Sequence, residues 1–170
     1  AELERLHSHL LWLGVAAHEI GFDTLFMYTW RDREKVLDIL AEVTGNRVNY
    51  SINTLGGVRR DLDDTILAGI SKMADILQTQ IQYYLDLTLT ETTLAARLAG
   101  IGKLSREDAL RFGAVGAVAR AAGVDYDIRI AEPYAAYADI PVKLVTDTNA
   151  DVFGRTLVRI QEMLESLNII

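Results

Sequence analysis

The chain of 170 residues contains no cysteine and only two prolines. Without thiols it cannot form disulfides, ligate an iron–sulfur cluster or build a thiolate metal site from its own residues. Basic clusters are also scarce: the longest is the pair Arg59-Arg60, and the formal net charge is −7. A protein that binds the phosphate backbone of nucleic acids usually carries a basic stripe, so we expect no nucleic-acid partner.

Long hydrophobic runs are missing as well. The best candidate, "LLWLGVAA" at 10–17, is far shorter than the ~20 residues that a membrane-spanning helix needs. No secretory signal is visible, so a cytoplasmic setting without a direct membrane span is expected. The first residues already follow a helical pattern without an initiating Met, and the chain stops abruptly on "ESLNII". We therefore expect the central part of a longer subunit, folded as a single domain over 1–170.

Apolar residues at spacings of three and four dominate the pattern. They predict helices over 2–20, 23–44, a six-turn segment after Asp64, 91–99, 105–113, 115–122 and a final segment after Asn149. Period-two alternation predicts a short half-buried strand over 47–55, and "PVKLV" at 141–145 is typical of a second. The predicted fold class is mainly α, a helical bundle with two short β elements.

Several local signals place the ends of these helices. Gly21 and the pair at 45–46 are typical helix stops, and Asp23 is a candidate N-cap. Ser105 with Asp108 forms a capping box, and Asn149 is the expected cap of the last helix. The charged run "RDREK" at 31–35 is interpreted as a solvated helix face.

All three histidines lie in "HSHLLWLGVAAHEIG" at 7–21. On a regular helix His7 and His9 point about 200° apart, and His18 lies roughly 16 Å from His7 along the axis. No single metal ion about 2 Å from each ligand can bind two of them. The zinc-protease pattern also fails, because no second His follows "HE" at the required spacing. We therefore expect no metal site here.

Glu19 follows Val15, Trp12 and Ser8 on one helical stripe. If that stripe is buried, the carboxylate either pairs with a cation or takes a raised pKa. A raised carboxylate is a useful proton carrier, whereas a pair with an Arg from elsewhere is only structural. The residues by themselves leave both alternatives open.

Two further clusters carry charge. "GGVRRD" at 56–61 lacks the spacing of a phosphate loop, and an ion-pair knot of Arg59, Arg60 and Asp61 is favoured over direct catalysis or cofactor binding. In an extended "VDYDIRI" at 124–130, Asp125, Asp127 and Arg129 would share one face. A solvated or salt-bridged edge is the simpler interpretation of that segment. No nucleophile motif is present.

Three long stretches in order resemble a known family. These are residues 1–62 (beginning "AELERLHSHLLWLG" and ending "GNRVNYSINTLGGVRRDL"), "GVDYDIRIAEPYAAY" at 123–137 and "TDTNADVFGRTLVRIQEMLESLNII" at 146–170. They resemble the catalytic large subunit of membrane-bound, energy-converting nickel–iron hydrogenases, and its relative, the D subunit of respiratory complex I (NADH:quinone oxidoreductase). The segment at 45–62 is closer to the hydrogenase branch.

The resemblance implies a nickel–iron hydrogenase large-subunit-like fold and an oxidoreductase subunit, inactive as an isolated piece. In the hydrogenase branch two Cys-x-x-Cys pairs hold nickel and iron, and this chain would lie between them. In the complex I branch those cysteines are lost and the cavity serves quinone. The implied partners are an iron–sulfur small subunit and membrane subunits, at the inner face of the cell membrane.

The family places an acid at the position of Glu19, Asp in many complex I members. The resemblance therefore implies that Glu19 transfers protons near the active cavity, with His18 beside it as a second candidate. The chain departs from the complex I pattern by carrying His18-Glu19 in place of Leu-Asp. A non-catalytic assembly module on the same scaffold remains a third alternative to the two enzymes.

Overall fold

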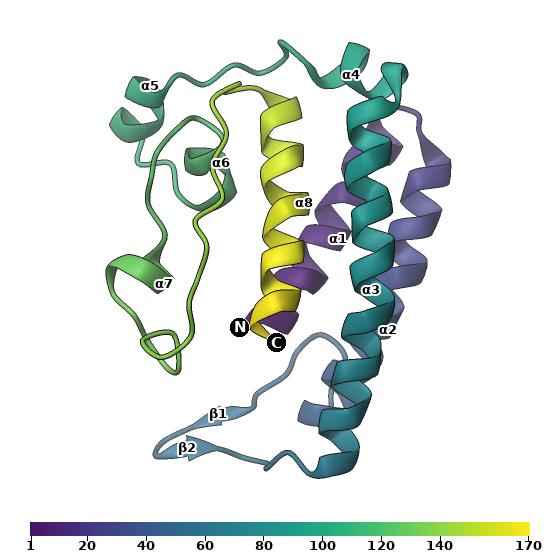
Figure 1. Cartoon of the computed structure of the whole chain (residues 1–170), viewed down its shortest axis with the longest axis vertical. Helices are drawn as coiled ribbons and strands as arrows, with labels where there is room; N and C mark the ends of the chain where they lie inside the picture. Colours follow the sequence, from purple (N-terminus) through teal and green to yellow (C-terminus); the bar gives the residue numbers. More distant parts are fainter. The chain divides into compact units, whose positions relative to one another are not determined.

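A computed structural model describes residues 1–170. It is mainly helical with one two-stranded sheet (Figure 1). The elements are α1 (Glu2–Glu19), α2 (Asp23–Thr44), β1 (Asn53–Thr54), β2 (Gly57–Val58), α3 (Asp64–Thr90), α4 (Thr92–Leu98), α5 (Arg106–Arg111), α6 (Gly116–Arg120), α7 (Ile128–Ala131) and α8 (Val152–Ile169). None of these helices has both the length and the apolar character needed to cross a bilayer.

The chain divides into two compact units. The first holds residues 1–80 with Ile170, and the second holds residues 81–169, so α3 passes from one to the other. A single domain over 1–170 stays a prediction. Each unit is built around its own helices, and each positions a different set of polar side chains.

In the first unit α1 packs along α2. The buried stripe of α1 is Leu6, Leu10, Leu13 and Ala17, at the spacing of one helix face. The two backbones approach closely at Gly14, where an added Cβ would lie 2.5 Å from the Thr29 hydroxyl. Only glycine therefore fits at this crossing. On its other side α2 lies against α3, where Arg31 donates a hydrogen bond to Gln80.

The prediction that residues 31–35 form a solvated helix face is wrong in part. Asp32 is completely buried and Arg33 is 8% exposed. Asp32 accepts hydrogen bonds from Arg31 (3.0 Å) and Lys35 (2.8 Å), which satisfy its carboxylate. The pattern missed this because α2 has helical neighbours on two sides, so its buried surface is wider than one stripe.

Between α2 and α3 the chain forms the β1–β2 hairpin, which reaches out from the helices of this unit (Figure 1). The pairs are Asn53 with Val58 and Thr54 with Gly57, so the adjacent glycines belong to the turn and the second strand. The half-buried strand over 47–55 is therefore wrong in length. Just before and at the start of this segment the chain forms a turn instead. The Asn46 side chain accepts hydrogen bonds there from the Val48 and Asn49 amides.

In the second unit short helices pack on α8. Small side chains form the contact between α6 and α8 and between α5 and α6, in two clusters: Ala117, Ala121 and Val158, and Ala109, Ala119, Ala122 and Val124. The capping box is confirmed, since Ser105 accepts from the Asp108 amide and donates to its carboxylate, each at 3.0 Å.

Three expectations for this unit are wrong. No strand forms at 141–145, and 124–130 is not extended, because Asp127 caps the short helix α7 by accepting from the Arg129 amide. The cap of α8 is Asp151 instead of Asn149. Asp151 accepts from the Gly154 amide (2.9 Å) and from the Gly100 amide (2.7 Å), and so ties the loop after α4 to the start of α8.

Candidate functional site

The segment singled out in the sequence ends at the C-terminus of α1. Glu19 is the last residue of that helix, and its side chain is exposed. The condition set for a paired or raised carboxylate is not met, because the stripe beneath Glu19 faces outward: Val15 is 42% exposed. No hydrogen bond or ion pair holds Glu19, so a carboxylate stands free at a helix end where negative charge is unfavourable.

His18 lies beside it and has a defined partner. Its ring nitrogen Nδ1 is 2.7 Å from Oδ1 of Asp23, the first residue of α2. The ring also lies against Phe26, with centroids 5.4 Å apart. The sequence indicated Asp23 only as a helix cap, and in the structure its carboxylate contacts His18 instead.

The turn between the helices fixes this arrangement. Gly21 has φ +79°, a conformation that favours glycine, and its amide donates to the His18 carbonyl at 2.9 Å. The Phe22 amide donates to the Ala17 carbonyl at 2.8 Å, which closes the helix end in a Schellman-type pattern. Asp23 follows immediately and is thus held next to His18.

The other histidines have different neighbours. His7 Nε2 is 2.6 Å from the Arg33 guanidinium, so His7 accepts this hydrogen bond as a neutral ring. Burial and the nearby Arg33 charge lower the pKa of His7. No group of three or more His, Asp or Glu side chains is placed to hold a metal ion. Together with the absence of thiols, this means that the residues present do not offer a ligand set for nickel or iron.

The candidates at 59–61 are all exposed and are not brought together. The Arg59 amide donates to the Ile52 carbonyl at 2.9 Å, and the Asp61 carboxylate accepts from the Leu62 amide at 2.9 Å. The Arg60 guanidinium lies over Gly45. The structure has no ion-pair knot among these three side chains. Of the three, the Asp61 side chain binds backbone at the start of α3 and the Arg60 side chain contacts Gly45.

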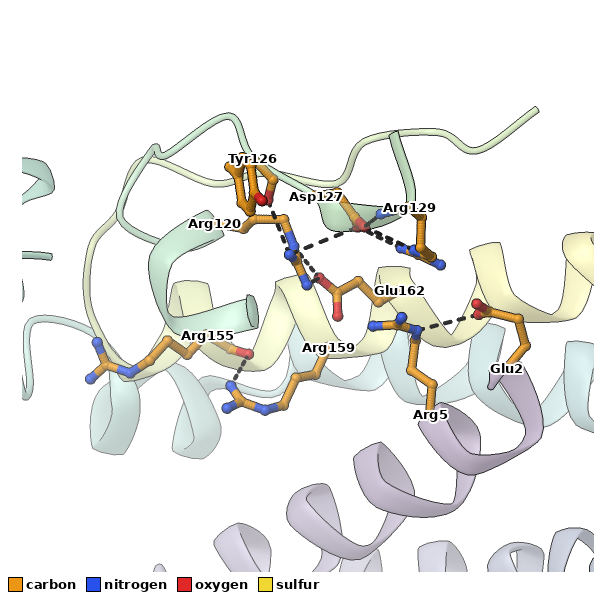
Figure 2. A network of polar contacts seen from close by, with 9 residues as sticks. All are labelled: Glu2, Arg5, Arg120, Tyr126, Asp127, Arg129, Arg155, Arg159 and Glu162. Carbon is orange, nitrogen blue, oxygen red and sulfur yellow. Dashed lines mark hydrogen bonds and ion pairs between the residues drawn. The ribbon is translucent and has the colours of Figure 1, made fainter. Parts of the chain in front are cut away.

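A buried ion network in the second unit was not anticipated (Figure 2). Arg120 of α6 pairs with Glu162 of α8 at 2.6 Å, and it donates to the Tyr126 carbonyl at 3.2 Å. Asp127 accepts from Arg129 at 2.7 Å and lies 3.8 Å from Arg120. All four charged side chains are at least nine-tenths buried.

Electrostatics in this network follow from its geometry. Burial acts to raise the pKa of Asp127, but hydrogen bonds and charge from Arg129 outweigh it and hold that pKa below its usual range. On α8 burial lowers the pKa of Arg159 to about 10. Asp127 and Arg129 do pair, as the salt-bridged interpretation of 124–130 required, whereas Asp125 is exposed and stands apart. The network fastens α6 and α7 to α8.

The first unit also contains a cavity of about 680 Å³, within the range of small-molecule sites. Apolar side chains from α2 and α3 and the segment 50–53 line it, together with both ends of the chain. Tyr50 stands in its wall, and burial, with the charge and hydrogen bond of Glu4, raises the pKa of that phenol. None of the residues predicted for the site lines this cavity.

Residues 19–170 match the family model described as the 49 Kd subunit of respiratory-chain NADH dehydrogenase, and the chain belongs to this family. This confirms the resemblance seen in the sequence. It defines the chain as part of an oxidoreductase-complex subunit.

Its curated relatives come from several such complexes. It is 41% identical to the membrane-bound hydrogenase subunit alpha of Pyrococcus furiosus (99% of this chain, 41% of that protein). It is 39% identical to a D subunit of the NADH-quinone oxidoreductase of Opitutus terrae (100% and 43%). It is 42% identical to the D subunit of the F(420)H(2) dehydrogenase of Methanosarcina mazei (99% and 45%). The chain thus spans less than half the length of these relatives.

Among solved structures, a chain of the membrane-bound sulfane sulfur reductase, an archaeal respiratory membrane complex, matches with a TM-score of 0.92. The sequences are 28% identical, and the match covers 99% of this chain and 45% of that chain. The neighbour is therefore a subunit of a membrane-bound complex as well.

Proposed function

We propose that the chain is the central part of the large subunit of a membrane-bound, energy-converting nickel–iron hydrogenase. The observation that carries the proposal is the match to the hydrogenase subunit alpha along essentially the whole chain. The whole protein would exchange protons and electrons with hydrogen, and its fold would be that of nickel–iron hydrogenase large subunits. Its nickel–iron centre would rest on residues outside these 170, which by themselves should bind no nickel.

The partners that fit this proposal are an iron–sulfur small subunit and membrane subunits, with the protein at the cytoplasmic face of the cell membrane. The names of the relatives support membership of such a complex. Glu19 is the proposed proton-transfer residue, with His18 beside it. Arg59, Arg60 and Asp61 are assigned no cofactor, because the structure does not bring their exposed side chains together.

The alternative is the D subunit of an NADH:quinone oxidoreductase, which reduces quinone while protons are pumped. It is supported by an almost equal identity, 39% against 41%. A non-catalytic assembly module is the third candidate.

The test is metal and activity analysis of the full-length protein purified with its complex. Stoichiometric nickel with hydrogen-dependent electron transfer is the expected result. Absence of nickel with quinone-dependent oxidation would select the alternative. Absence of both activities, with flanking segments that lack the paired cysteines, would favour the assembly module.

A further inference from the structure

Arg33 of α2 is a buried cation without a carboxylate partner. The residue is 8% exposed, and its guanidinium makes one hydrogen bond, from Nη2 to His7 Nε2 at 2.6 Å. Since arginine can only donate, His7 accepts this bond as a neutral ring and brings no negative charge. The Nε atom of Arg33 is completely covered and has no acceptor. No Asp or Glu oxygen lies within ion-pair distance of the guanidinium.

The acids closest to Arg33 are already bound to other groups. Asp32 accepts hydrogen bonds from two cations of its own helix. Glu34 accepts from an arginine of the following loop, and Glu4, one turn before the histidine in α1, accepts from a phenol. Burial accordingly lowers the pKa of Arg33, and the charge of Glu34 offsets this only in part. The chain therefore leaves this charge without a neutralising partner.

The aromatic neighbour of Arg33 does not supply an acceptor either. The guanidinium carbon lies 5.2 Å from the centre of the Trp30 ring, a contact that attracts the cation without neutralising it. The indole N–H of Trp30 is itself a covered donor without a partner, because it faces the helix crossing, where a Cβ added at Gly14 would lie 2.8 Å from it. A buried charge in such surroundings is costly unless an anion is provided.

We propose that Arg33 binds an Asp or Glu carboxylate from a protein segment outside these 170 residues and thereby anchors the α1–α2 pair to the rest of the enzyme. This rests on the proposed function, in which the chain is the central part of a longer subunit in a complex. The carboxylate would meet Nη1, the one guanidinium nitrogen that is neither hydrogen-bonded nor fully covered. At a site with one open edge, a carboxylate fixed to a folded chain is favoured over a free anion, because it loses less translational freedom on binding.

The first test is the structure of the full-length wild-type complex at a resolution that shows side chains. A carboxylate oxygen is expected within about 4 Å of Nη1, the distance of an ion pair. It can belong to another segment of the same subunit or to a partner subunit, and the traced chain distinguishes these two sources. A free small anion, an ordered water or open solvent at this edge would overturn the proposal.

The second test measures charge, with Arg33→Met in the full-length complex. To keep the imidazole from titrating, both arms carry His7→Gln, because the pKa of His7 itself depends on Arg33. Near pH 7.5 the thermal midpoint should fall by about 5 °C or more, since a buried carboxylate loses its cation. The loss should shrink toward about pH 5.5, because the abandoned carboxylate has a raised pKa in the folded state and takes up a proton there.

Arg111→Met in the same background is the matched control, because Arg111 is a helix arginine whose pair with Asp108 is exposed. Its midpoint should shift by no more than about 2 °C, equally at both pH values. An unchanged or raised midpoint for Arg33→Met would show that no anion faces the guanidinium. A loss of the same size at both pH values would reduce Arg33 to a packing role, and either result contradicts the anchor.

Neither test of Arg33 depends on turnover, so the proposed function can fail separately. A wild-type complex without hydrogen-dependent activity would defeat the hydrogenase assignment and leave the carboxylate at Arg33 in place. An active hydrogenase in which the Arg33 edge faces solvent would defeat the anchor alone.

Discussion

Two kinds of charged side chain in this chain differ most in their surroundings: those held in buried pairs and those left without an ion pair at an exposed helix end. Arg120 and Glu162 represent the first group, and Glu19 represents the second. A buried charge that loses its partner is costly, whereas an exposed one costs little. The two groups therefore predict opposite results for mutation.

Arg120→Met should lower the free energy of unfolding by about 3–5 kcal/mol, because it leaves Glu162 without the guanidinium 2.6 Å away. Urea denaturation measures this change. The control is Arg111→Met, which breaks the exposed 2.7 Å pair with Asp108 and should cost at most about 1 kcal/mol. Equal losses in the two variants would contradict the importance of burial in the network.

His7 makes stability depend on pH near neutrality. Its folded-state pKa is lowered by burial and by Arg33, so the unfolded chain, with a His pKa of about 6.5, binds the proton more readily. Stability is therefore full above about pH 6.5 and declines as the pH falls toward the lowered pKa.

The urea midpoint between pH 7.5 and 5 should fall more steeply in the wild type than in His7→Gln. The difference between the two proteins isolates His7, because the carboxylates that titrate at lower pH are common to both. Parallel curves would show that His7 does not contribute.

At the scale of the helices, the close packing of α1 against α2 depends on Gly14. Gly14→Ala would place a Cβ 2.5 Å from Thr29 Oγ1 and 2.7 Å from Trp30 Cδ1, so the helices must separate. We expect a loss of about 1–3 kcal/mol in the free energy of unfolding, typical of overpacking.

The matched control is Gly69→Ala in α3, where the nearest atom, Ile39 Cδ1, would be at an ordinary 3.5 Å. Alanine should be neutral there or stabilise by up to ~1 kcal/mol, through helix propensity. If both substitutions had the same effect, propensity and not close approach would govern Gly14.

Helix positions could be predicted from the sequence because their signals are local. Gly45 ends α2 in the left-handed conformation, and Ser105 caps α5, as their patterns indicated. Contacts between distant residues could not be predicted. Nothing in the sequence links Arg120 to Glu162, and the pattern around Asp127 indicates a strand until its cap on α7 is seen.

The candidate site was predicted only in part for a similar reason. The stripe of α1 through Val15 and Glu19 is as apolar as a core stripe, but packing against α2 uses the stripe of Leu10 and Leu13 instead. The hydrophobic pattern alone therefore could not show which of these two faces of α1 is buried. Position 19 still stood out, because the family resemblance does not depend on burial.

At the scale of the whole molecule, the chain spans less than half the length of the relatives that it matches. In the proposed enzyme, the metal chemistry would depend on segments and subunits beyond these residues. The described residues carry no metal ligand set, so their proposed contribution is proton transfer at the end of α1. Glu19 is the residue on which this claim depends.

The most direct test is Glu19→Gln in the full-length enzyme, with turnover and unfolding measured on the same preparation. We predict that turnover falls by about 10²-fold, as for loss of an acid–base group. The free energy of unfolding should stay constant or rise by a few tenths of a kcal/mol, because an unfavourable charge leaves the C-terminus of α1. Unchanged turnover, or a loss fully explained by unfolding, would contradict proton transfer by Glu19.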